Sequence, residues 1–341
     1  MLHIRFPELG ISLDVNRVAF HIGSFNVYWY GIIIAVGFLL AVLYAMKSAP
    51  KFDLDPDKLM NCIIVGILCG IVGARAYYVI FYPGDMFLKN PAKIIDIHDG
   101  GLAIYGGVIG GLLGGCITAK LSKMRVSAVL DIASLGFLIG QSIGRWGNFV
   151  NQEAFGRETD LPWGMVSENT GNVPVHPCFF YESMWCLIGF ILLHFFSRRL
   201  RHYDGQVFLL YLLWYGFERF IVEGLRTDSL LLPGLSLRVS QVLAGALVIV
   251  SAVALLVLHK RTVLSGVGSP RIMALNGIVD KVPEDLVTDE TVQELSAGQE
   301  HTEASEEGKP TQEAEQETKA ADSAEPAPQE TQPNQQEETN G

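Results

Sequence analysis

The chain has 341 residues, of which 49% are hydrophobic, and its mean hydropathy is positive at +0.29. Because the final stretch is polar, the apolar residues are concentrated in the rest of the chain, which excludes an ordinary soluble protein. The net charge of −11 is the sum of two unlike parts of the chain. The part from Asp280 onward has 18 acidic and 3 basic residues, and the part before it has 18 acidic and 22 basic residues. The mildly basic body suits a protein that faces anionic lipid.

Seven apolar segments predict an all-α polytopic membrane protein, because each is close to the ~20 residues that a helix needs to cross about 30 Å of hydrocarbon. They cover residues 26–46, 58–81, 102–121, 126–144, 179–196, 206–223 and 239–258. The sequence begins without the pattern of a cleavable signal peptide, so the first segment is expected to direct insertion.

The distribution of lysine and arginine predicts the orientation of these segments. Every second connection is rich in basic residues, and such connections are cytoplasmic in most membrane proteins. The N-terminus is therefore predicted to lie outside and the C-terminus in the cytoplasm. The basic residues of these connections are Lys47, Lys51, Lys58, Lys120, Lys123, Arg125, Arg198, Arg199, Arg201, Lys260 and Arg261.

Two regions are predicted along the chain. Residues 1–262 form a seven-helix membrane domain, and residues 263–341 form a cytoplasmic acidic tail of low complexity. From about Pro283 the tail is rich in Glu, Gln, Thr, Ser, Ala and Pro and almost lacks aromatic residues. Such a composition buries too little apolar surface to offset the entropy of ordering, so we predict a disordered tail without a catalytic role.

Glycine spacing in the third segment predicts close helix packing, with a groove for lipid as the alternative. Gly106, Gly110 and Gly114 recur at intervals of four residues, and small residues on one face let a neighbouring backbone approach. The five cysteines form no CxxC pair, and we expect neither a disulfide nor a metal ligand among them. No HExxH motif or nucleotide-binding loop is present, so no cofactor, metal or nucleic-acid partner is predicted.

Four ionisable residues stand out because they lie within or at the end of apolar segments: Arg75, Arg145, Arg219 and Glu223. Charge within a spanning helix is costly and usually marks a site or a pathway. With the predicted orientation, Arg75 and Arg219 fall roughly 6–10 Å below the outer boundary, and Arg145 lies at that boundary. Three cations are thus predicted at one level of the outer leaflet.

An anionic lipid headgroup is the natural ligand for arginines at that level, because the guanidinium fork binds phosphate oxygens and stays charged. The alternative is that the arginines snorkel or pair with Glu153, Glu182 or Glu223 to hold the bundle together. On the sixth segment Arg219, Glu223 and Arg226 share one face, since they are spaced at i, i+4 and i+7. The neighbouring Glu218 is expected to point elsewhere and is less easily explained.

The most specific local pattern is GRWGNFVNQEAFGR, from Gly144 to Arg157. Its Asn, Glu and Arg side chains cannot face lipid, because a buried polar group needs a partner. They are expected to face protein, water or a bound headgroup.

This stretch resembles the signature of the bacterial phosphatidylglycerol:prolipoprotein diacylglyceryl transferases. The resemblance extends in order over about residues 15–260. Matching positions in the signature are Arg145, Gly147, Asn148, Phe149, Asn151, Glu153 and Gly156, and those elsewhere are Trp29, Tyr30, Gly31, Gly73, Ala74, Arg75, Gly106, Gly107, His176, Pro177, Tyr181, Glu182, Arg219, Phe220, Glu223 and Arg226.

The resemblance implies transfer of a diacylglyceryl group from phosphatidylglycerol to the lipobox cysteine of a prolipoprotein, at the outer leaflet of the bacterial cell membrane. Under that hypothesis Arg145 and Arg219 hold the phosphate, and Asn148 and Glu153 fix Arg145 and the headgroup. A transporter or channel for an anionic lipid or solute is the alternative, although no internal repeat is visible. The residues expected to bind the lipid are Arg145, Asn148, Asn151, Glu153, Gly156, Arg75, Tyr30, Glu223 and Arg226.

One position departs from part of the family. Some members carry a histidine just before the glycine pair of the third segment, and this chain has Tyr105 there. Tyr105 is a candidate catalytic residue, but a phenol with a reference pKa near 10 needs cationic neighbours to act as a base at neutral pH. The group that takes the thiol proton stays open at this point.

Overall fold

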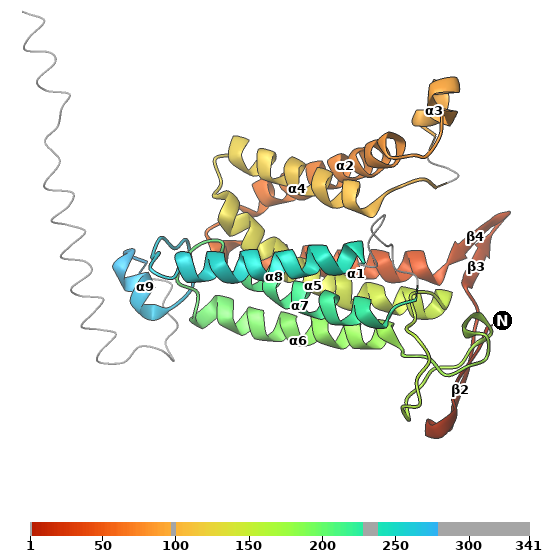
Figure 1. The fold of residues 1–341 in the computed structure, drawn as a ribbon. Helices are drawn as coiled ribbons and strands as arrows, with labels where there is room; N and C mark the ends of the chain where they lie inside the picture. Colours follow the sequence, from red (N-terminus) through yellow and green to blue (C-terminus); the bar gives the residue numbers. More distant parts are fainter. Residues whose placement is uncertain (1, 97–99, 228–237, 279–341) are drawn as a thin grey trace, which may run out of the picture.

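The computed structural model describes residues 2–96, 100–227 and 238–278, and it is mostly helical (Figure 1). Seven long helices run roughly side by side. Their bounds are Trp29–Ser48 (α1), Pro56–Ile80 (α2), Ile104–Leu121 (α4), Val126–Asn151 (α5), Cys178–Arg199 (α6), Gln206–Leu225 (α7) and Val239–Val257 (α8). Two short helices, Met86–Lys89 (α3) and Pro270–Leu275 (α9), lie outside the bundle.

Six of the seven long helices are long and apolar enough to cross a membrane, within the part of the chain that the structure describes. The exception is α7, whose 20 residues include Glu218, Arg219 and Glu223. It nevertheless packs along α5, α6 and α8 inside the bundle. An all-α membrane protein is therefore confirmed, while the seventh crossing and the orientation of the termini stay predictions.

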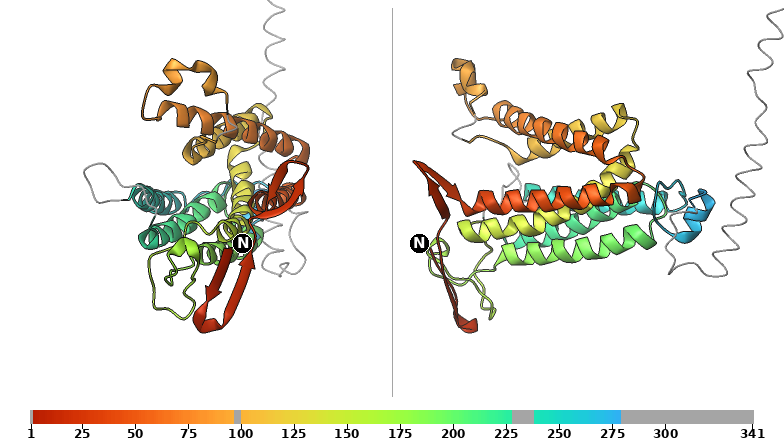
Figure 2. Two further views of the ribbon diagram at one scale, coloured as in Figure 1. Left: turned by 90° about the vertical axis from the view of Figure 1, so that its right-hand side faces the viewer. Right: turned by 180° about the vertical axis from the view of Figure 1, so that it is seen from behind.

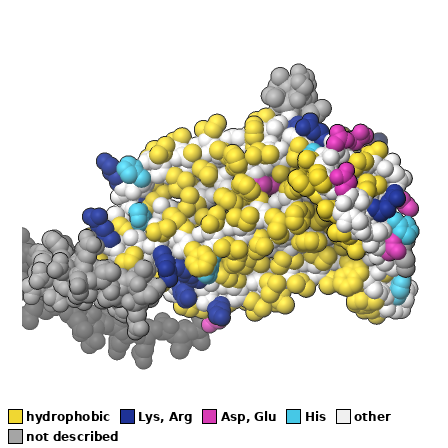
Figure 3. All heavy atoms as spheres, turned by 90° about the horizontal axis from the view of Figure 1, so that it is seen from below, with side chains coloured by type: hydrophobic (Ala, Val, Ile, Leu, Met, Phe, Trp, Pro, Cys, Tyr) yellow, Lys and Arg dark blue, Asp and Glu magenta, His cyan; other side chains and the backbone are white. Residues whose placement is uncertain are grey.

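The surface agrees with a membrane-embedded middle. In Figure 3 the side chains along the middle of the visible face are almost all hydrophobic, and charged side chains gather at its two ends. Helix α1 illustrates the pattern, because Leu39, Leu40 and Leu43 are about half exposed although they are large and apolar. Such exposure is unfavourable in water and is expected against lipid tails.

Four strands precede the helices and were not predicted from the sequence. They form two antiparallel hairpins, the first from Leu2–Phe6 (β1) and Ile11–Val15 (β2), and the second from Val18–Ile22 (β3) and Phe25–Tyr28 (β4). The first hairpin alternates apolar and polar residues, so that Ile4 opposite Leu13 lies on one face and Arg5 opposite Ser12 on the other. Ile4 is buried against Met165, Val175 and Phe179. We call this end of the bundle the strand end.

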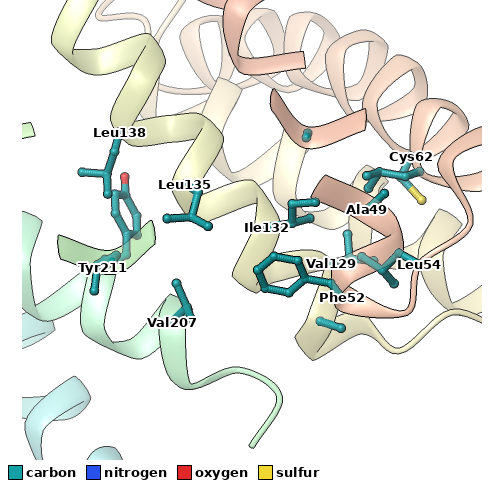
Figure 4. Close-up of a cluster of buried hydrophobic side chains, with 14 of the residues drawn as sticks. Ala49, Phe52, Leu54, Cys62, Val129, Ile132, Leu135, Leu138, Val207 and Tyr211 are labelled. Atoms are coloured by element: carbon teal, nitrogen blue, oxygen red, sulfur yellow. The ribbon is translucent and has the colours of Figure 1, made fainter. Parts of the chain in front are cut away.

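Two unequal groups of helices make up the bundle (Figure 2). Helices α1, α5, α6, α7 and α8 form the larger group, and α2 and α4 form a pair at its side. The main hydrophobic core follows α5, where Ile132, Leu135 and Leu138 are fully buried (Figure 4). Val207 and Tyr211 of α7 pack against it from one side (Figure 4).

The glycine-rich face of α4 packs against glycines of α2, as its spacing predicted. A Cβ atom built on Gly73 would lie 2.5 Å from the carbonyl oxygen of Gly106 and 3.0 Å from the Cα of Gly110. Since real Cβ atoms do not approach a backbone so closely, only glycine permits this contact.

The folded part continues beyond the expected boundary at residue 262. Residues 263–278, including α9, fold onto the end of the bundle opposite the strands, the α9 end (Figure 1). Arg201, which is 0% exposed, holds them in place: it donates to the backbone carbonyls of Ser265 and of Val267, the latter at 2.9 Å. It also pairs with the buried Asp131 at 3.3 Å. The remaining tail, 279–341, lies outside the described residues.

A substitution at the α2–α4 contact tests this packing. Gly73→Ala should lower the free energy of unfolding by about 1–3 kcal/mol, because the added methyl group overlaps the α4 backbone. Gly107→Ala is the matched control, since its Cβ would lie 3.5 Å from that of Ala74, an ordinary contact. Thermal unfolding of both variants in detergent measures the effect, and equal stability of the two would contradict the packing.

Candidate functional site

A cluster of charged side chains joins α5, α6 and α7 near the strand end. At its centre is Glu182 of α6, which is 1% exposed. Its Oε2 atom lies 2.9 Å from Nε of Arg145 on α5, and its Oε1 atom accepts a hydrogen bond of 3.0 Å from Nη1 of Arg219 on α7. One buried carboxylate therefore binds two guanidinium groups from two other helices.

Helix periodicity places the fourth member of this cluster. Glu223 lies one turn after Arg219 on α7, and its Oε2 is 2.6 Å from Nη2 of that arginine. The face predicted from the i, i+4 spacing is thus formed. Arg219 is held on two sides by carboxylates and keeps 17% of its side chain exposed, while Arg145 keeps 20%.

The signature stretch ends α5 and turns back over the cluster. Gln152 adopts a left-handed backbone with φ of 51° and ends the helix. Farther along, the amide of Gly156 donates to the carbonyl of His176 at 2.9 Å, and the amide of Arg157 donates to the carbonyl of Leu225 at 2.7 Å. A Cβ at Gly156 would lie 2.7 Å from that of His176, so this tight connection requires glycine. Gly156 also forms an isolated β-bridge with Arg226 at the end of α7.

The remaining signature residues form a second polar group beside α1. Glu153 accepts hydrogen bonds from Nδ2 of Asn148 at 2.9 Å and of Asn151 at 3.4 Å. Arg17 donates to the backbone carbonyl of Asn151 at 2.7 Å. Asn148 and Glu153 were expected to orient Arg145, but Glu182 makes that contact instead.

An open recess of about 810 Å³ adjoins this second group. Tyr30 lines it together with Glu153 and Asn151, and a Cβ on Gly147 would lie 2.7 Å from Cδ2 of Tyr30. The glycine of the signature therefore lets the tyrosine ring pack against α5. Tyr30 thus lies beside the signature residues, and its role in lipid binding stays a prediction.

Arg75 makes a different set of contacts from the other arginines. It donates five hydrogen bonds to backbone carbonyls of the connection between α2 and α4, at 2.5–3.2 Å. The acceptors are the carbonyls of Lys93, Ile94, Asp96, Gly100 and Gly101. In this structure Arg75 therefore orders a connection and does not join the cluster around Glu182.

Tyr105 links two helices at the strand end. Its hydroxyl lies 3.2 Å from Oγ of Ser240 on α8, and its ring faces that of Tyr77 on α2, with the centroids 6.4 Å apart. Tyr105 thus spans the side of the bundle between the α2–α4 pair and α8.

An apolar cavity of about 480 Å³ lies between the α2–α4 pair and the larger helix group. Glycines and aliphatic side chains line most of it, and Gln141 and Tyr211 are its polar members, joined by a hydrogen bond of 3.0 Å. Gln141 is one helical turn before Arg145 on α5, so the cavity approaches the charged cluster from the apolar middle of the bundle. Glycines of the α4 face line part of it, where the glycine spacing had offered a lipid groove as the alternative to packing alone.

The arrangement suits recognition of an anionic group attached to apolar chains. Each arginine has five N–H donors, of which the carboxylates use only one or two, so donors remain for a further anion. The carboxylates hold both side chains in place before any ligand arrives, which reduces the entropy cost of binding. An adjacent apolar cavity provides room for hydrocarbon.

Comparison with known proteins gives consistent similarities. The family model described as prolipoprotein diacylglyceryl transferase matches residues 17–257. Three bacterial proteins named phosphatidylglycerol–prolipoprotein diacylglyceryl transferase are similar over most of their length. The one from Bacillus cytotoxicus is 41% identical over 261 residues, 74% of this chain and 95% of the relative. Those from Finegoldia magna and Clostridioides difficile are 40% and 41% identical, over 73% and 72% of this chain and 98% and 97% of theirs.

Removing the central carboxylate should loosen the cluster. Glu182→Gln is expected to lower the free energy of unfolding by about 3–5 kcal/mol, because breaking a buried ion pair leaves charged partners uncompensated. Glu153→Gln is the control, since this side chain is exposed and its loss of charge should change stability by no more than about 0.5 kcal/mol. Denaturation of both purified variants measures the difference; similar losses would show that Glu182 is not the anchor.

Proposed function

The chain belongs to the prolipoprotein diacylglyceryl transferase family, and we propose that it transfers the diacylglyceryl group of phosphatidylglycerol to the lipobox cysteine of prolipoproteins. The product is a thioether, and glycerol 1-phosphate is released. The observation that carries this proposal is the pair Arg145 and Arg219, both bound to Glu182 beside an apolar cavity.

The reaction is a displacement at carbon. The thiol sulfur attacks the glycerol carbon that bears the phosphate, the S–C bond forms, and the C–O bond breaks with its electron pair left on the phosphate oxygen. The proton of the thiol passes to a base or to solvent. Negative charge therefore grows on the phosphate, and donors fixed in advance around it lower the barrier.

Arg145 and Arg219 are suited to hold this phosphate, with Glu182 and Glu223 fixing their orientation. Arginine binds two phosphate oxygens at once through its fork, and a low-dielectric site strengthens that contact. The cavity that begins near Gln141 suits the acyl chains of the same lipid, since its lining is almost wholly apolar.

The second polar group, around Glu153, is suited to the glycerol headgroup or to a lipid entering the site. Asn148 and Asn151 bind Glu153, and the recess that they border also contains Tyr30. Amide and carboxylate side chains bind hydroxyl groups well.

Gly156, Arg226 and Arg75 complete the proposed binding set. Gly156 allows the tight turn over the cluster and bridges to Arg226, whereas Arg75 contributes by ordering the connection before α4.

We further propose seven crossings, with the N-terminus outside, the C-terminus in the cytoplasm and the active site toward the outer leaflet of the bacterial cell membrane. Two features support this topology. Helix α7 packs along the other long helices, and the N-terminal strands and α9 lie at opposite ends of the bundle (Figure 1). Basic residues such as Lys51, Arg198 and Lys260 fall in connections that would then be cytoplasmic.

The direct test is an assay with purified protein, labelled phosphatidylglycerol and a lipobox peptide. Thioether-linked lipid should form on the peptide that contains Cys. A peptide with Ser in its place should stay unlabelled. Release of lipid across a liposome membrane without any labelled peptide would instead support a transporter.

Arg145→Lys should reduce turnover at saturating phosphatidylglycerol by at least about a hundredfold, corresponding to roughly 2.7 kcal/mol of transition-state stabilisation. Lysine keeps the charge but loses the planar fork that orients the phosphate. A folded variant with a rate within tenfold of the unmodified enzyme would refute this role.

Tyr105→Phe should lower turnover by about a hundredfold or more if the hydroxyl takes part in proton transfer. Ser240→Ala is the matched control, because it breaks the same hydrogen bond but leaves the phenol in place. If both variants lose activity equally, the hydroxyl only bridges α4 and α8, and Tyr105 is not catalytic.

Deletion of the residues after Asp280 should leave transfer activity within a few-fold. The signature and both polar groups precede residue 227, and the contacts of Arg201 with the chain after α8 involve Ser265, Val267 and Ser269, all before the deleted segment. The assay compares the full chain with the shortened one at equal amounts in the membrane. Loss of activity in a shortened protein that inserts normally would assign the tail a role.

A further inference from the structure

Glu218 was expected to point away from the Arg219 face, but it is buried and lies in the charged cluster. It takes no part in the reaction as proposed. Glu218 is only 4% exposed, and both of its Oε atoms are buried without a hydrogen-bond partner among the described residues. Glu182 and Glu223 differ from it, because each lies within 3.0 Å of an arginine nitrogen. Glu218 is therefore the carboxylate of this cluster that is least compensated as an anion.

Charged groups from three helices act on Glu218. Two further titratable groups interact with Glu218, the phenol of Tyr215 on α7 and the thiol of Cys186 on α6. The charged groups are Arg145 of α5, Glu182 of α6, Arg219 of α7 and Arg226 at the end of α7.

A bound phosphate would change the net charge of the cluster. When all are ionised, the side chains named here comprise three arginines and three glutamates, whose charges cancel. They are Arg145, Arg219, Arg226, Glu182, Glu218 and Glu223. A phosphodiester adds one negative charge, so four anions would then face three cations in a medium of low dielectric constant. Neutralising one carboxylate restores the balance, and Glu218 loses the fewest contacts on protonation.

We propose that Glu218 binds one proton when the phosphate of an anionic lipid enters the cluster. Lipid binding and proton uptake are thus coupled, and the site accepts a monoanionic headgroup without excess negative charge. This inference rests on the proposed function and adds to it a residue that adjusts the charge of the site to its substrate.

The same position argues against Glu218 as the base for the thiol. In a displacement the sulfur approaches the carbon from the side opposite the leaving phosphate. A group among the arginines that hold the phosphate lies on the leaving-group side and cannot reach the thiol proton.

The test measures binding of phosphatidylglycerol in mixed micelles from about pH 6 to about pH 9. Once Glu218 is ionised in the free protein, the affinity should fall by about tenfold per pH unit, because binding then requires uptake of one proton. Glu218→Gln mimics the protonated carboxyl, so its affinity should not follow this dependence and should exceed that of the unmodified protein at the highest pH. Glu218→Asp should keep the dependence.

Two controls isolate the charge of this residue. Glu168→Gln alters an exposed carboxylate in the connection between α5 and α6 and should retain the pH dependence of the unmodified protein. Diacylglycerol, which lacks the phosphate, should bind with no pH dependence in any variant. A dependence that persists unchanged in Glu218→Gln would overturn the proposal.

Proton uptake by the unmodified protein gives an answer even if the glutamine variant does not fold. In weak buffer above the pH at which Glu218 ionises, about one proton should be taken up per phosphatidylglycerol bound. No uptake would overturn the inference. Thioether formation, assayed separately on the unmodified protein, decides the proposed function, so the inference can fail while the activity stands.

Discussion

The contact of Glu182 with Arg145 and Arg219 sets the arrangement of the helices around it. A carboxylate that is 1% exposed is costly unless cations and donors surround it, and here the cations come from α5 and α7. Three helices must therefore meet with their side chains in register. Because the arginines are held by this carboxylate, they can present their remaining donors to a phosphate without a large loss of side-chain freedom.

Under the proposed function, the two groups of helices have different roles in binding a lipid. The larger group holds the charges, and the α2–α4 pair is joined closely through glycine backbones but contacts the larger group sparingly. Space for hydrocarbon remains between them, in the cavity lined by both. Tyr105 crosses from this pair to Ser240 of α8 at the strand end, so the same pair also borders the polar site.

A second buried ion pair holds the opposite end of the bundle. Asp131 accepts hydrogen bonds from the amides of Gly205 and Phe208 at 2.8 and 2.9 Å while it pairs with Arg201. These contacts fix the turn between α6 and α7 and anchor residues 263–278 beside it. Helix α7, which carries Glu218, Arg219 and Glu223, is thus held by polar contacts near both of its ends.

The sequence by itself determined the membrane class, the positions of the long helices, the α4 glycine face and the Arg219–Glu223 spacing. These features follow from residue order along one helix, where hydrophobic length and a fixed periodicity decide the outcome. Only the tertiary structure decided that Arg145 binds Glu182 and not Glu153, and that Arg75 turns to backbone carbonyls. It also decided that Glu218 is buried without a hydrogen-bond partner in the part of the chain that the structure describes. Those outcomes depend on which helices become neighbours and how they rotate. These arrangements are stabilised by contacts between residues far apart in the chain, and a local sequence pattern does not predict such contacts.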